Sequence, residues 1–340
     1  MRQPNFENLL RVLRCEEPDR PTLFEFFLNQ RLYRQLAGPA WHEDPDLTKH
    51  FSKLAVCFAA AGYDYATIGG AAFGFPAAAQ ARASTISLNE GFVITDRAGF
   101  AAYPWQNPDD CDYSGIDGAG ALLPEGMKFI VCGPGGVLEN VISLCGYDNL
   151  CFMIADDPAL AEEVFAAVGS RLVRHYEIVA AKPAVGACIS NDDWGFKTQT
   201  MLSLDDMRTY VFPWHVKIVE AIHAAGKPAI LHSCGNLALV MDDIIDVMRY
   251  DGKHSYEDVI QPVEDAYDQY GGRIAILGGI DLDFICRASL EEITARGRAM
   301  LARAKGKGGY ALGTGNSVPE YIEDARYFAM TKAALEPAAV

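Results

Sequence analysis

Short apolar runs rich in β-formers alternate with amphipathic stretches along the whole chain, and this alternation predicts βα units around a parallel sheet. Eight runs are predicted as strands, at residues 20–27, 63–69, 128–133, 185–190, 228–232, 250–255, 273–278 and 309–313. Helix signals separate them, such as the capping box Ser289-Leu-Glu-Glu292. Eight such units suit a closed barrel better than an open, doubly wound sheet. The pattern therefore predicts a single α/β domain over residues 1–340, a (β/α)8 TIM barrel.

The region after the second predicted strand departs from this pattern. Residues 84–105 alternate with a period of two around Asn89-Glu-Gly91, which predicts a β-hairpin insertion at that point. No GxGxxG sequence follows the first strand, and the chain contains no Walker A sequence. A Rossmann-type dinucleotide enzyme is therefore disfavoured.

Composition and charge narrow the class of protein. The formal net charge of −16 argues against a nucleic-acid partner and against a general affinity for polyanionic substrates. No apolar run has the ~18–20 residues needed to span a bilayer, and the first residues lack the apolar core of a signal peptide. The nine cysteines are scattered and contain no CxxC pair, which predicts reduced thiols. We expect a cytoplasmic protein that works without a membrane; the oligomeric state stays open, with a homodimer as one option.

Polar side chains gather where the predicted strands end. The ends in question are Asn191-Asp-Asp-Trp-Gly195, His232-Ser-Cys-Gly-Asn236, His254-Ser-Tyr-Glu-Asp258, Gly278-Gly-Ile-Asp281 and Gly313-Thr-Gly-Asn-Ser-Val-Pro319. In a barrel of this kind, the residues that do chemistry sit at the C-terminal ends of the strands. Turn chemistry alone hardly explains five polar ends in succession, so the active site is predicted there.

His232 and Cys234, at the end of the fifth predicted strand, are the sharpest pair. Residues i and i+2 of an extended strand point to the same side, so both donors can reach one ion. Imidazole plus thiolate suits Zn2+, although a packed histidine beside a buried thiol is the alternative reading. A catalytic zinc needs a third protein ligand, for which Glu257 and His254 are the first candidates. Behind them stand Asp192, Asp193 and Asn316.

The remaining strand-end residues are assigned with structural alternatives beside them. Adjacent aspartates on an extended backbone point to opposite sides, so only one of Asp192 and Asp193 need face the cavity, and the other can cap a turn. Asp281 is equally a helix cap or a substrate contact. We predict catalytic roles for Glu257, Asp193 and Asn316, and substrate binding by Asn191, Asp192, Trp194, Tyr256 and Asp281.

In their order, these strand ends resemble the uroporphyrinogen decarboxylase superfamily, and His232-Ser-Cys234 resembles its corrinoid-dependent methyltransferase branch. The resemblance covers nearly the whole chain. Decarboxylases of the superfamily carry Met-Arg-Gln-Ala-Gly-Arg after strand one to grip an acidic porphyrinogen, whereas this chain has Phe27-Leu-Asn-Gln-Arg-Leu-Tyr-Arg34. An octa-carboxylate also needs cations, yet the five strand ends hold five Asp or Glu and no Lys or Arg. Decarboxylation of that substrate is therefore disfavoured.

Thiol-methylating members of the branch bind zinc through a His-x-Cys pair and a later Cys, whose position is Asn316 in this chain. The resemblance therefore fits methyltransferase I, or O-demethylase-like, components better. It implies a zinc-dependent transfer of a methyl group from a methoxylated aromatic, or a similar small donor, to the Co(I) corrinoid of a separate carrier protein. An acid near Glu257 or Asp193 would protonate the departing oxygen. A methylcobalamin:thiol methyltransferase, a decarboxylase of a smaller acid and a non-catalytic corrinoid-binding or small-molecule-binding barrel are the alternatives.

Overall fold

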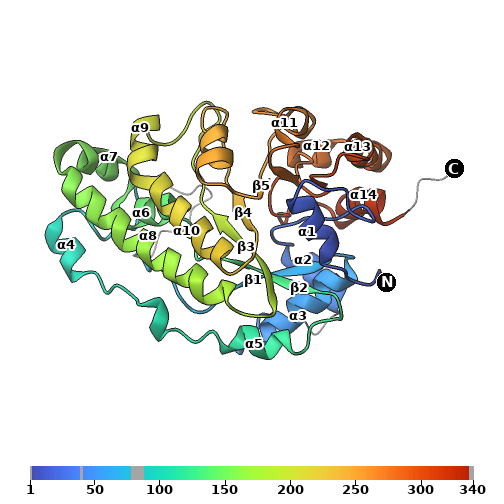
Figure 1. Ribbon diagram of the computed structural model, residues 1–340, viewed down its shortest axis with the longest axis horizontal. Coiled ribbons are helices and arrows are strands. Elements are labelled where there is room, and N and C mark those ends of the chain that lie inside the picture. Colours follow the sequence, from blue (N-terminus) through green and yellow to red (C-terminus); the bar gives the residue numbers. More distant parts are fainter. Residues whose placement is uncertain (1, 39–40, 78–87, 337–340) are drawn as a thin grey trace.

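The computed structural model describes residues 2–38, 41–77 and 88–336 (Figure 1). Within them the chain is an α/β protein built on a parallel sheet of seven strands that follow one another in sequence order. The strands are β1 Tyr65–Gly69, β2 Lys128–Cys132, β3 Val185–Asn191, β4 Ala229–His232, β5 Gly252–His254, β6 Ala275–Leu277 and β7 Tyr310–Ala311. Each coincides with a run predicted as a strand, and β3 extends one residue beyond its predicted run. Because all of them are parallel, their carboxyl ends meet at one edge of the sheet.

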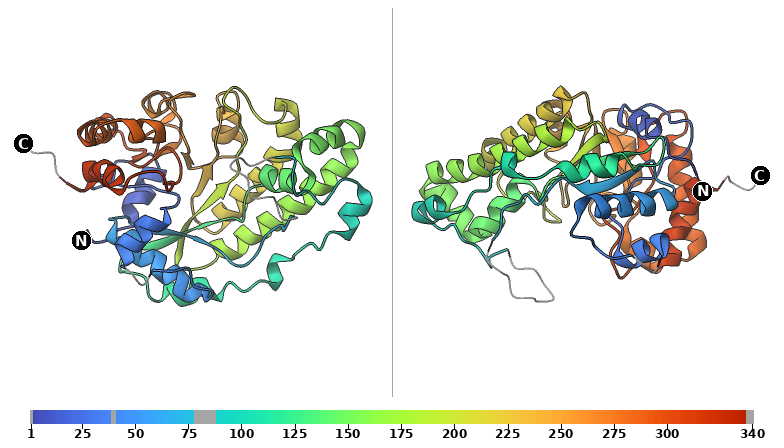
Figure 2. Two further views of the ribbon diagram at one scale, coloured as in Figure 1. Left: turned by 180° about the vertical axis from the view of Figure 1, so that it is seen from behind. Right: turned by 90° about the horizontal axis from the view of Figure 1, so that it is seen from below.

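Helices connect the strands and cover the sheet. They are α1 Glu7–Leu13, α2 Gln30–Ala37, α3 Leu47–Ala60, α4 Arg97–Ala102, α5 Ser114–Gly120, α6 Val137–Cys145, α7 Tyr147–Asp156, α8 Pro158–Ala180, α9 Leu204–Asp206, α10 Phe212–Ala224, α11 Val263–Tyr270, α12 Leu282–Arg287, α13 Leu290–Ala304 and α14 Asp324–Leu335. The capping box predicted at α13 is present, because Ser289 Oγ accepts from Glu292 N and Glu292 accepts from Ser289 N. Helices α1 and α14 lie at one end of the molecule, and α4 and α7 lie at the other (Figure 1, Figure 2).

The predicted first strand, residues 20–27, forms only an isolated bridge. Leu23 pairs in parallel with Leu312, so the segment lies beside β7. This is the position that the remaining strand of an eight-stranded barrel takes. On the side toward β1, the main chain of Glu25 forms hydrogen bonds with the side chain of Tyr65. The N–H of Glu25 donates to Tyr65 Oη, and the carbonyl of Glu25 accepts from the same hydroxyl, both at 2.7 Å. The hydroxyl thus binds the main-chain N–H and carbonyl groups that would otherwise pair with a neighbouring strand. Among the described residues, no main-chain ladder joins this segment to β1.

The predicted hairpin over residues 84–105 is not confirmed. Its first arm, including Ile86, lies partly outside the described residues. Residues 88–105 contain α4 and no strand. Ile94 is fully buried, and the N–H groups of Val93 and Ile94 both donate to the carbonyl of Leu144 near the end of α6. On the described side, only Ile94 of the alternating apolar residues is buried, whereas Leu88 and Phe92 are exposed.

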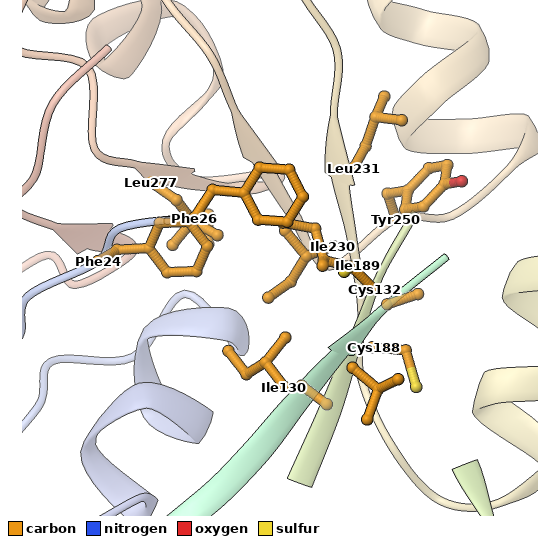
Figure 3. Close-up of a cluster of buried hydrophobic side chains, with 14 of the residues drawn as sticks. Phe24, Phe26, Ile130, Cys132, Cys188, Ile189, Ile230, Leu231, Tyr250 and Leu277 are labelled. Carbon is orange, nitrogen blue, oxygen red and sulfur yellow. The ribbon is translucent and has the colours of Figure 1, made fainter. Parts of the chain in front are cut away.

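One part of the core lies between the inner face of the sheet and the N-terminal segment. Phe24 and Phe26 belong to a cluster of buried side chains that also contains Ile130 of β2, Ile230 of β4 and Leu277 of β6 (Figure 3). Burial of such large apolar side chains supplies most of the driving force for folding. The N-terminal segment is thus held by side-chain packing where its main-chain pairing is incomplete.

Among the described helices, no single one has both the length and the apolar character to cross a membrane; the adjoining helices α6 and α7, bent by 94°, pass that test only when taken together.

Candidate active site

The register of the sheet brings three polar residues to one level at its carboxyl edge. His232, the last residue of β4, is paired with Asn191 at the end of β3 and with His254 at the end of β5. The edge is therefore lined by residues that are far apart in the sequence, as expected where parallel strands end.

Asp193, His232 and Cys234 form a compact donor group just beyond these strand ends. Their ligand atoms, one from each residue, all lie within 4.8 Å of one another, and Cys234 Sγ is 3.8 Å from His232 Nε2. The carboxylate of Asp193 is tied to the turn because its Oδ1 accepts from the main-chain N–H of Cys234 at 2.9 Å. Among the residues that the structure describes, no other group of three such donors occurs. One imidazole, one sulfur and one carboxylate suit Zn2+, so the donor set fits the metal that the sequence predicts.

The predicted third ligand, Glu257, does not belong to this group. It lies in a turn, where its carbonyl accepts from the N–H groups of Ile260 and Gln261, and its side chain lines a neighbouring cavity. The third donor near His232 and Cys234 is Asp193. The reason is the hydrogen bond to Cys234, which couples the loop after β3 to the loop after β4.

A chain of hydrogen bonds sets the tautomer of His232. The carbonyl of Thr314 can only accept, so His254 Nε2, 3.2 Å away, donates to it. Burial lowers the pKa of His254 well below its usual value and that of His232 to about 4, so both rings are neutral at pH 7. The Nδ1 of neutral His254 then accepts from His232 Nδ1, at 2.8 Å. This leaves the lone pair on Nε2 of His232 facing Cys234, as ligation requires.

Glu25 supports this chain from the N-terminal segment, and sequence reasoning missed it. Its fully buried carboxyl group accepts from the main-chain N–H of Thr314 at 2.7 Å and from the Thr314 hydroxyl at 2.6 Å. Burial raises the pKa of Glu25 to about 8. An acidic residue in the apolar run Leu23-Phe-Glu-Phe-Phe27 was the available signal.

The sulfur of Cys234 has two further polar neighbours. Ser255 Oγ and Asn316 Nδ2 each lie 3.3 Å from Sγ and can donate to it. Burial, with a smaller contribution from the charge of Asp193, raises the pKa of Cys234 to about 12. Without a cation the group is therefore a thiol, and a bound metal would favour the thiolate. Asn316, predicted to be catalytic, contacts the sulfur directly.

Three residues predicted to bind substrate, namely Asp192, Trp194 and Asp281, are engaged within the fold. Asp192 is fully buried, and its carboxylate accepts from Leu138 N and Glu139 N at the start of α6, each at 2.9 Å. Trp194 is also fully buried and packs against His215, with ring centroids 4.7 Å apart.

Asp281 caps α12 instead of facing an open site. Its carboxylate accepts from Phe284 N and Asp258 N, both at 2.9 Å. Two other predicted contacts remain near the donor group: Asn191, whose Oδ1 has no hydrogen-bond partner in the described structure, and Tyr256.

A cavity of about 160 Å³ adjoins the donor group between the loops that follow β4 and β5. Tyr256 and Glu257 line it, together with Gly235, Asn236, Leu237, Ala238, Met241, Lys253, Ser255, Ile260 and Gln261. Lys253 is almost fully buried; its ammonium donates to the carbonyl of Ser255 at 2.6 Å and lies 4.2 Å from the centre of the Tyr256 ring. Burial lowers its pKa to about 8. Sequence reasoning missed Lys253, although a lysine within a short buried strand was the signal.

Comparison with known proteins identifies the family to which the chain belongs. The family model of uroporphyrinogen decarboxylase (URO-D) matches residues 130–336, which is more than half of the chain and includes the whole donor group. The chain belongs to the uroporphyrinogen decarboxylase family. The superfamily resemblance that the strand ends predicted is thereby confirmed. No curated protein matches the chain.

One solved structure shares the fold over nearly its full length. A methyltransferase from Methanosarcina mazei is similar with a TM-score of 0.72 and 14% identity, covering 96% of this chain and 97% of its own. A B12-independent methionine synthase from Shewanella sp. W3-18-1 matches with a TM-score of 0.44 and 12% identity over 61% of each chain. The first likeness establishes a shared fold over nearly the full length, and the second is too distant to carry an argument.

Proposed function

We propose that this chain is a zinc-dependent methyltransferase that moves a methyl group from a methoxylated aromatic, or a similar small donor, to the Co(I) corrinoid of a separate carrier protein. The observation that carries the proposal is the Asp193–His232–Cys234 donor group at the carboxyl edge of the sheet. Membership of the URO-D family and the fold shared with a methyltransferase are consistent with it. We take the fold as a (β/α)8 barrel in which residues 20–27 hold the position of the first strand, and the location as cytoplasmic.

In this proposal the three side chains hold zinc and leave a position open for substrate. When bound, zinc acts as a Lewis acid on the ether oxygen of the donor. Because Asp193 is engaged as a ligand, Glu257 becomes the candidate for holding the proton that the departing oxygen takes up. Its half-buried side chain lines the cavity beside the donor group, next to Tyr256. Asn191, with its unpaired Oδ1, is available to orient the substrate.

Exposed apolar side chains on the surrounding loops support a partner that covers this edge. Phe196 follows β3, Leu239 follows β4, Val259 follows β5 and Tyr321 follows β7, and all four are exposed. Apolar residues grouped in this way commonly mark an interaction surface. A corrinoid carrier must place its cobalt within reach of the methyl group, so we assign this rim to the carrier.

Two assays test the proposal. Zinc analysis should find stoichiometric metal in the wild type and little in His232→Ala. Reduced cobalamin supplied with a set of methoxybenzenes should yield methylcobalamin, followed by absorbance, with the wild type and not with the variant. Equal zinc in both proteins would remove His232 as a ligand. Demethylation of methylcobalamin by an added thiol, without activity on any methoxybenzene, would replace the proposal with the thiol methyltransferase.

A further inference from the structure

Ser255 has an unusual main-chain conformation for a residue with a side chain. Its φ is +85°, in the left-handed region that L-residues rarely adopt, and it is almost fully buried. Such a conformation persists only when surrounding contacts impose it, and it often marks a functional position.

Two contacts hold the peptide that follows Ser255. Its carbonyl accepts from the buried ammonium of Lys253 at 2.6 Å, and the N–H of Tyr256, at the other end of the same peptide, donates to the carbonyl of Gly315 at 3.0 Å. The peptide plane is thus fixed on both sides. The consequence is that the Ser255 hydroxyl faces Cys234 Sγ, 3.3 Å away.

Asn316 approaches the same sulfur from the loop after β7, with Nδ2 also at 3.3 Å. Its orientation is set because its Oδ1 accepts from Ser317 N at 2.7 Å, which directs the amide N–H groups toward the sulfur. The one sulfur of the donor group therefore faces two neutral hydrogen-bond donors. Hydrogen bonds to a ligating sulfur draw negative charge from it and tune the metal.

We propose that Ser255, held in place by Lys253, acts with Asn316 as a positioning residue that withdraws negative charge from the Cys234 sulfur and makes a metal in the donor group a stronger electrophile. This inference rests on the proposed function and deepens it. A more electrophilic metal polarises an ether oxygen better, whereas activation of a thiol nucleophile requires the opposite tuning. The two hydrogen bonds to the Cys234 sulfur therefore favour a methyl donor whose oxygen binds the metal.

Cobalt substitution tests the role of the hydroxyl separately from catalysis. With Co2+ in place of zinc, the wild type should show a thiolate-to-cobalt charge-transfer band that Cys234→Ser abolishes. Ser255→Ala and Ser255→Gly both remove the hydroxyl, but glycine also relieves the left-handed strain. Both variants should move the band to longer wavelength by the same amount and weaken zinc binding roughly tenfold. With a methoxybenzene donor, kcat should fall while KM stays near the wild-type value.

Arg249→Gly is the matched control, because Arg249 is exposed and has φ +63°. It should leave the band unchanged. An unchanged band in both Ser255 variants, or an effect in Ser255→Ala that glycine restores, would overturn the inference. A wild type that shows no charge-transfer band would overturn the metal site and the proposed function with it. A band without any methyl transfer would overturn the proposed function alone, and the Ser255 variants would still decide the inference.

Discussion

Two hydrogen-bond networks, one centred on His215 and one on His232, meet at the adjacent residues Asp192 and Asp193 near the carboxyl edge of the sheet. They differ in whether both ring nitrogens of the histidine have strong hydrogen-bond partners. In the closed network, His215 contacts Asp192 Oδ2 at 2.8 Å through Nε2 and Tyr250 Oη at 2.7 Å through Nδ1, and all three side chains are buried. In the open network, His232 uses Nδ1 for His254 and leaves Nε2 facing Cys234 and Asp193.

The comparison shows that burial of a histidine beside a carboxylate does not by itself indicate a functional site. Both ring nitrogens of His215 have protein partners, so neither nitrogen is free to bind a ligand. His232 has one nitrogen without a strong partner, directed at two further donor atoms. Asp192 and Asp193 are neighbours in the sequence, yet one belongs to each network.

The largest expected effect comes from removing the carboxylate of Asp193 from the proposed metal site. Asp193→Ala should lose bound zinc and lower methyl transfer at least about 10³-fold, equivalent to about 4 kcal/mol, because one of three ligands is gone. Its free energy of unfolding should change by only about 1 kcal/mol, the worth of one hydrogen bond. Zinc analysis, transfer assays and urea unfolding measure these quantities. Retained zinc with full activity would exclude Asp193 from the site.

The neighbouring substitution should behave in the opposite way. Asp192→Ala leaves His215 and the first N–H groups of α6 without their partner, so the free energy of unfolding should fall by about 3 kcal/mol. The folded fraction should bind zinc as the wild type does. Loss of zinc at unchanged stability would place Asp192 in the open network and remove the distinction between the two.

Glu25, which is hydrogen-bonded to Thr314 beside the open network, predicts that the free energy of unfolding depends on pH. The pKa of Glu25 is about 8 in the folded chain and 4.5 ordinarily, so between these values the folded state holds the extra proton. Raising the pH through this window therefore removes stability, by about 2 kcal/mol between about pH 5 and about pH 7. Glu25→Gln should remove most of this slope in urea unfolding at several pH values. The same slope in both proteins would assign the pH dependence to other groups.

The smallest expected effect concerns the orientation of the free nitrogen. His254→Ala removes the acceptor for His232 Nδ1 and should weaken zinc binding about tenfold, or about 1.4 kcal/mol, measured by competition with a chelator. His254→Asn retains an acceptor and should recover part of the affinity. Equal weakening in both variants would indicate that only packing around His254 matters.

Much of the framework was readable in the sequence. Seven of the eight predicted strands are present, because runs such as Pro228-Ala-Ile-Leu-His232 are apolar, short and bounded by turn residues. The His232-Ser-Cys234 spacing correctly placed an imidazole and a sulfur on the same side. The first strand was overestimated because its apolar pattern cannot reveal that a tyrosine hydroxyl occupies the main chain of Glu25.

The sequence by itself determined the parallel α/β framework, the polar strand ends and the closeness of one imidazole and one sulfur, because these depend on periodicity and on neighbours a few residues apart. Only the tertiary structure decided that Asp193, and not Glu257, completes the donor group, that Asp192 and Asp281 cap helices, and that Ser255 and Lys253 support the site. Which partner satisfies each buried polar group depends on contacts between distant segments, and those contacts exist only after the sheet has assembled.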